Sequence, residues 1–111
     1  MRFRFFKLIL DAQSADETLS EEIKITELGS VNEISFYIVF SAGTSAGAVQ
    51  IESAHLSGYS GVWAAEGSAI SWSAASKASK VSISGASFVL RARISTAIVG
   101  GTVSVWAVAN G

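Results

Sequence analysis

Residues 33–55 read EISFYIVFSAGTSAGAVQIESAH, and they hold the pattern that decides the fold. Before the glycines, large apolar residues occupy every second position, namely Ile34, Phe36, Ile38 and Phe40. After the glycines, Val49 and Ile51 alternate with Gln50 and Glu52. Because successive side chains of a strand point to opposite faces, this period predicts two antiparallel strands, each with one buried face, joined by a turn.

The same alternation recurs toward the C-terminus, in SKVSISG (79–85), SFVLRARIS (87–95) and GTVSVWAVA (101–109). Further strands are expected in RFRFFKLIL (2–10) and EEIKITEL (21–28), with shorter ones around 62–65 and 69–72. No stretch keeps a helical period. The sequence therefore predicts an all-β protein, an antiparallel β-sandwich of jelly-roll or immunoglobulin-like type with about eight or nine strands. We expect residues 1–111 to form a single domain, in which 11–33 is an acidic, partly loop-like segment.

The composition is unusually apolar for a small chain. Half of the 111 residues are hydrophobic, 15% are charged, and the net charge is −1. Such a chain either enters a membrane or buries much of its surface against neighbouring subunits. Two uncharged stretches, 34–51 and 94–111, approach membrane-spanning length, but Gly, Ser and Thr interrupt both, which favours strand-turn-strand. We therefore expect no membrane partner, and the few basic residues predict no nucleic-acid partner.

The segment GTSAG (43–47) matches G-x-S-x-G, the pattern that presents a nucleophilic serine in many hydrolases. That serine needs a strand-turn-helix context and a histidine oriented by a carboxylate. Here strands are expected on both sides of Ser45. Glu52, the acid nearest before His55, is three residues away from it in an extended strand and would point to the opposite face. The chain has one histidine and no cysteine, so we expect no catalytic residues, no metal site and no cofactor.

Several residues are candidates for contact with a partner. Arg91 and Arg93 share a strand face that is expected to meet Trp106 on the next strand, in a cation–π contact or a partner-binding patch. Ile98 and Val99 stand at an expected hairpin tip, where apolar residues indicate that something covers them. The basic and aromatic start, with Arg2, Phe3 and Phe5, is a further candidate interface.

Two features leave alternatives open. The acidic segment 11–33 is either a solvated loop or an arm that docks on a basic neighbouring subunit. Tyr59, Trp63 and Trp72 either pack in the core or at a subunit interface, which is the more common fate of tryptophan, or stack on sugar rings as a glycan-binding site.

From Gly43 to the C-terminus the chain resembles small β-sandwich virion proteins of tailed bacteriophages. The matching pieces are GTSAGAVQIESA, GVWAAEG, SKVSISGASFVLRARIS and GGTVSVWAVA. The resemblance implies a virion structural protein, such as a capsid decoration or cement subunit, or a small tail or neck component, assembled in the host cytoplasm. It also implies a homo-oligomer, a trimer being one arrangement, in contact with the major capsid protein or another virion protein.

The expected function is therefore a non-enzymatic capsid decoration or stabilising subunit that assembles through apolar strand edges and loops. The alternative is a carbohydrate-binding β-sandwich module that serves virion adhesion.

Overall fold

The computed structural model describes residues 3–24, 33–56, 58–73, 78–84 and 89–110, and side chains for most of these. The described residues form nine strands and no helix, which confirms the predicted all-β class. The strands are β1 (Phe3–Gln13), β2 (Ile23–Lys24), β3 (Glu33–Phe40), β4 (Ala46–Ala54), β5 (Ala64–Ala65), β6 (Ile70–Ser71), β7 (Ala78–Ser84), β8 (Val89–Val99) and β9 (Val103–Asn110).

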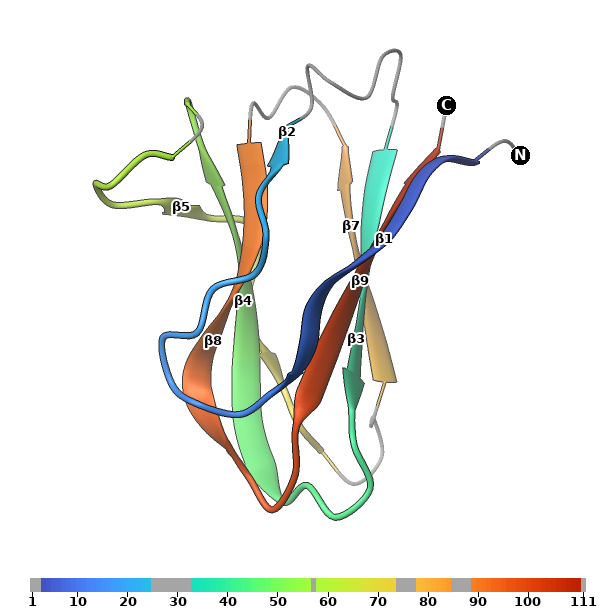
Figure 1. The fold of residues 1–111 in the computed structure, drawn as a ribbon, viewed down its shortest axis with the longest axis vertical. Coiled ribbons are helices and arrows are strands. Elements are labelled where there is room, and N and C mark those ends of the chain that lie inside the picture. Colours follow the sequence, from blue (N-terminus) through green and yellow to red (C-terminus); the bar gives the residue numbers. More distant parts are fainter. Residues whose placement is uncertain (1–2, 25–32, 57, 74–77, 85–88, 111) are drawn as a thin grey trace.

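The strands form two antiparallel sheets that pack face to face (Figure 1). Sheet A has the order β1-β9-β3-β7, and sheet B has the order β2-β8-β4-β5, with β6 also paired to β4. The pairing is nested: β1 with β9, β2 with β8, β3 with β7, and β4 with β5 and β6. A long antiparallel ribbon folded over on itself gives this order, which is that of a jelly roll.

The core lies between the two sheets and follows the alternation of the sequence. Phe36 and Ile38 are fully buried on β3, and Val49 and Ile51 are fully buried on β4, as the period predicts. The remaining fully buried large side chains come from β8 and β9: Val89, Leu90, Ile94, Val103 and Val105. Residues 33–55 therefore contribute one strand to each sheet, and the turn between these strands carries the chain across the sandwich.

That turn packs against a second crossing turn, between β8 and β9, at the same end of the molecule (Figure 1). The Ser45 amide donates to the carbonyl oxygen of Val99 over 2.8 Å, and the Ser41 amide donates to that of Thr102 over 2.8 Å. Gly43 and Gly100 adopt φ angles of 92° and 83°, in the left-handed region that favours glycine. The glycines are needed because the two turn backbones touch.

Gly100→Ala is therefore expected to destabilise the protein by about 2–3 kcal/mol. A Cβ at this position would collide with the carbonyl oxygen of Gly43, in addition to the cost of a side chain at this φ. Gly67→Ala is the matched control, because Gly67 has a φ of +77° and no atom within 4 Å of an added Cβ. Thermal unfolding of both variants separates the two costs, and equal losses would contradict a close turn-to-turn contact.

Candidate functional site

The serine and histidine of the apparent hydrolase pattern lie far apart. Ser45 precedes β4 and His55 follows it, so the whole nine-residue strand separates them. The Ser45 hydroxyl donates to the Val99 carbonyl oxygen over 3.4 Å, and the His55 ring packs edge-on against Tyr59 with centroids 4.6 Å apart. The two side chains therefore form no dyad. The chain turns at residues 41–45, as predicted, and Ala46 and Gly47 of GTSAG already belong to β4.

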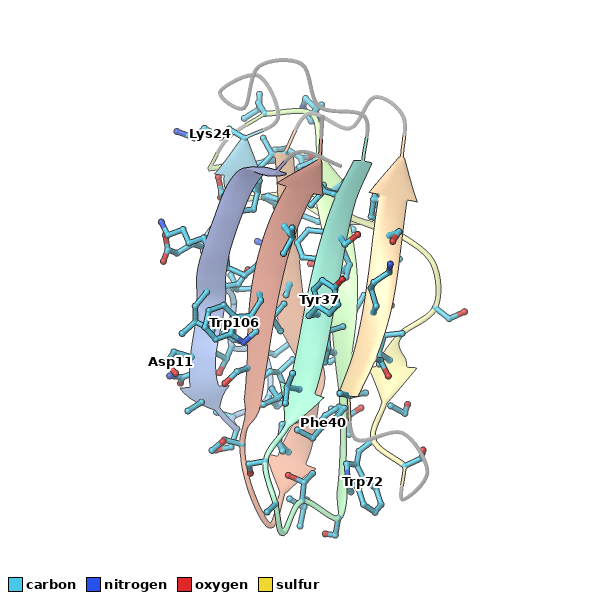
Figure 2. All side chains as sticks on the ribbon, turned by 90° about the vertical axis from the view of Figure 1, so that its right-hand side faces the viewer. Asp11, Lys24, Tyr37, Phe40, Trp72 and Trp106 are labelled. Carbon is cyan, nitrogen blue, oxygen red and sulfur yellow. The ribbon has the colours of Figure 1, made fainter. Side chains whose placement is uncertain are left out.

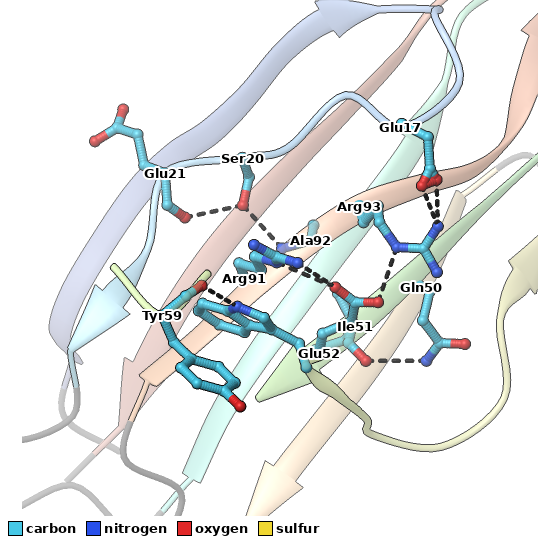
Figure 3. A network of polar contacts seen from close by, with 11 residues as sticks. Glu17, Ser20, Glu21, Gln50, Ile51, Glu52, Tyr59, Arg91, Ala92 and Arg93 are labelled. Atoms are coloured by element: carbon cyan, nitrogen blue, oxygen red, sulfur yellow. Dashed lines mark hydrogen bonds and ion pairs between the residues drawn. The ribbon is translucent and has the colours of Figure 1, made fainter. Parts of the chain in front are cut away.

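A polar cluster lies on the outer face of sheet B and is centred on Glu52 (Figure 3). Glu52 on β4 lies directly opposite Arg91 on β8, and Gln50 lies opposite Arg93. The Glu52 carboxylate accepts from Arg91 Nε at 3.1 Å and from Arg93 Nε at 2.8 Å, while Arg91 Nη2 lies 3.0 Å from the first oxygen. Only 8% of the Glu52 side chain is exposed. Both oxygens are thus held by guanidinium groups, which leaves the carboxylate poorly placed to act as a base.

The cluster continues to the acidic segment. Arg93 Nη1 donates to both carboxylate oxygens of Glu17, at 3.0 and 2.8 Å. The hydrogen bond to Glu52 raises the pKa of Arg93 above its ordinary value; burial opposes this, and the charges of Glu52 and Glu17 add to it. Charges therefore alternate along Glu17, Arg93, Glu52 and Arg91, an arrangement in which every neighbouring pair attracts.

The indole of Trp63 covers one end of this charge series. The Arg91 guanidinium carbon lies 3.9 Å from the ring centroid, a cation–π contact, and the indole Nε1 donates to the Tyr59 carbonyl oxygen over 2.8 Å. The prediction that Arg91 and Arg93 meet Trp106 is therefore wrong. The reason is topological, because β8 belongs to sheet B and β9 to sheet A, so consecutive strands face different sides of the sandwich.

Residues 17–22 of the acidic segment contact other parts of the same chain. Residues 17–20 run along the edge of β8, where the Glu17 and Ser20 amides donate to the carbonyl oxygens of Ile94 and Ala92, each over 2.9 Å. The carboxylate of Glu21 pairs with Lys7, and that of Glu22 accepts from the Gly58 amide at 2.9 Å. Within the described residues, these acids are thus used inside the subunit.

The three aromatic candidates for glycan stacking do not share a surface. Trp63 is 6% exposed and lies beneath Arg91, and Tyr59 is half-buried beside His55. The Trp72 amide donates to the carbonyl oxygen of Gly47, at the other end of β4 from Trp63, and the Trp72 side chain packs against the core. These side chains therefore form no common stacking platform.

The interface candidates also have different surroundings. Ile98 is 6% exposed and packs within this chain against Gly47, so the chain itself covers it, whereas Val99 is 54% exposed. Arg2 lies outside the described residues, as do the side chains of Phe3 and Phe5. Trp106 is partly exposed on the outer face of sheet A (Figure 2).

Trp106 belongs to a surface that we call the outer apolar face, formed by Leu8, Tyr37, Val39 and Trp106 on sheet A. Leu8, Trp106 and Tyr37 lie side by side on β1, β9 and β3, and Lys80 on β7 continues the same row. Tyr37 is 42% and Val39 41% exposed. This face was not predicted, although a signal exists: EISFYIVF carries apolar residues on both faces of its strand, as buried strands do.

Among the described residues, no three His, Asp or Glu side chains gather as a metal site would require, and no helix could cross a bilayer. No protein-family model, curated protein or solved structure matches the chain.

Proposed function

We propose that this protein is a non-enzymatic structural subunit of a bacteriophage virion, a capsid decoration or stabilising protein that assembles through exposed apolar surface. The observation that carries the proposal is the contrast between the two outer faces of the sandwich. On sheet B the chain covers the outward-facing polar residues of β4, since Gln50 and Glu52 are 8% and 6% exposed and are hydrogen-bonded to residues of the same chain. On sheet A, Tyr37 and Val39 are 42% and 41% exposed, and partly exposed apolar side chains of this kind are typical of surfaces that meet another protein.

Two further features support this proposal. The jelly-roll strand order is one that viral capsid domains use, although lectin domains and cupins share it, so the fold alone does not assign the function. The resemblance of residues 43–111 to small virion sandwiches points in the same direction. A decoration subunit needs a rigid body with exposed apolar surfaces. In this sandwich, the cross-strand ion pairs and the hydrogen-bonded contact between the two crossing turns contribute to rigidity.

The test is co-assembly with a capsid. The chain should be expressed together with the major capsid protein encoded near its own gene, and the particles separated on a density gradient. We expect the chain to sediment with the particles in a fixed ratio and to raise their resistance to heat or to low salt. A chain that stays at the top of the gradient, or a gene surrounded by no virion genes, would refute the proposal.

A further inference from the structure

We infer that the outer apolar face binds the same face of a second copy of this chain, around a two-fold axis that runs parallel to the strands. This inference rests on the proposed function in one respect, because both require that exposed apolar surface of this chain binds another protein chain. It names the partner and the contact geometry, which the proposed function leaves open.

The outer side of sheet A, which carries the outer apolar face, is large enough for a modest dimer. Four strands spaced about 4.8 Å apart, each about eight residues long, present roughly 500 Å² on one side of a sheet. Two such faces stacked together bury on the order of 1,000 Å², which is near the lower bound for a specific interface. The side chains that would be buried include Tyr37 and Trp106, residue types enriched where proteins associate.

The central row of the face is complementary to itself. Across sheet A the row reads Leu8, Trp106, Tyr37 and Lys80, and the middle of the sheet falls between β9 and β3. A two-fold axis along the strands at this middle line reverses the row in the second copy. Trp106 of each subunit then lies over Tyr37 of the other, an aromatic pair, and Leu8 lies over the aliphatic stem of Lys80.

Two different two-fold axes would stack the outer apolar faces of two copies, one along the strands and one across them. The charges at the edges of sheet A favour the axis along the strands. Lys80 is on the edge strand β7, with its ammonium 6.0 Å from the centroid of Tyr37, and Asp11 lies at the opposite edge, on β1 (Figure 2). An axis across the strands would place Lys80 over Lys80 of the second copy. An axis along the strands places the β7 edge over the β1 edge, so that Lys80 lies over Leu8 and its long side chain extends toward Asp11, three residues further along β1. Opposite charges at the rim then favour one orientation.

The first experiment tests which surface is used. Sedimentation velocity should be run on the full chain over a wide concentration range, together with Val39→Lys and the matched control Val62→Lys. Val62 is 93% exposed and lies outside sheet A, so the same substitution there should leave the dimer intact. Val39→Lys buries an unpaired charge twice in each dimer and should raise the dimer Kd about 100-fold or more. A monomeric parent chain, a trimer, or equal behaviour of the two variants would overturn the inference.

The second experiment tests the orientation by charge exchange. Lys80→Glu should weaken the dimer about tenfold, because two rim pairs become repulsive at once. The double variant Asp11→Lys with Lys80→Glu should return the Kd to within about threefold of the parent value, because the swap restores opposite charges. A Kd for the double variant that remains as weak as that of Lys80→Glu alone would exclude the axis along the strands.

The two proposals fail in distinguishable ways. The Val39→Lys variant should also be mixed with capsids and separated on the density gradient. Its sedimentation with or without the particles shows whether the dimer face is also the face that binds the capsid. A chain that forms the dimer but never joins capsids refutes the virion role alone. A chain that joins capsids while remaining a monomer in solution refutes the dimer alone. If a panel of polysaccharides, but no second copy, protects this face, the occupant named here is wrong.

Discussion

Glu52→Gln is expected to lower the free energy of unfolding by about 3 kcal/mol. The substitution keeps the shape of the side chain but removes the negative charge between two arginines whose side chains are only 14% and 26% exposed. Arg91 and Arg93 would then face each other across a neutral amide in a poorly solvated site. The value is at the lower end for breaking a buried ion pair, because Arg93 keeps its contact with Glu17.

Glu17→Gln provides the matched control for this prediction. Its side chain contacts the same arginine but is 62% exposed, so solvent screens the pair and the expected loss is below about 1 kcal/mol. Urea unfolding of both variants at neutral pH measures the two values. Similar losses for Glu52 and Glu17 would mean that burial does not govern the strength of this charge series.

Phe36→Ala is the second large effect, with an expected loss of about 3–5 kcal/mol. Phe36 is 0% exposed and lies on β3, one of the two inner strands of sheet A, where it faces the core between the sheets. Removing the ring deletes its buried apolar surface and leaves a cavity that the surrounding strands cannot close, because their backbones are fixed by pairing on both sides of β3.

Leu56→Ala is the control for the core substitution. Leu56 follows β4, is 45% exposed, and lies outside both the core and the outer apolar face, so its truncation should cost less than about 1 kcal/mol. Chemical denaturation should give the same m-value for the parent and both variants. A Phe36→Ala protein as stable as Leu56→Ala would place the core elsewhere.

The sequence predicted the strands well because their signal is local. Period-two alternation is read within a few residues, and it correctly placed Phe36, Ile38, Val49 and Ile51 in the core. The turn in GTSAG was also correct, since glycine-rich stretches between apolar runs mark turns through backbone geometry alone. His55 indeed follows the strand that this turn begins.

Local sequence patterns do not show which strand belongs to which of the two sheets. A turn that joins two strands within one sheet and a turn that crosses between sheets can have similar composition. The turn after Val99 was expected to form a hairpin, but it crosses to sheet A, and this is why the partner of Arg91 is Trp63 and not Trp106. Sequence alone also left the partners of the acidic segment open, because Glu17 and Arg93 meet only through long-range folding.

The nested strand order also sets when the protein can fold during its synthesis. The described part of β1 pairs with β9, so that Phe6 must wait for Val108, and β2 must wait for β8. The innermost pairs, β4 with β5 and β6, close the shortest loops and are available first. We therefore expect slow folding that finishes after the ribosome has made β9, with the apolar strand at the N-terminal end exposed to chaperones until then.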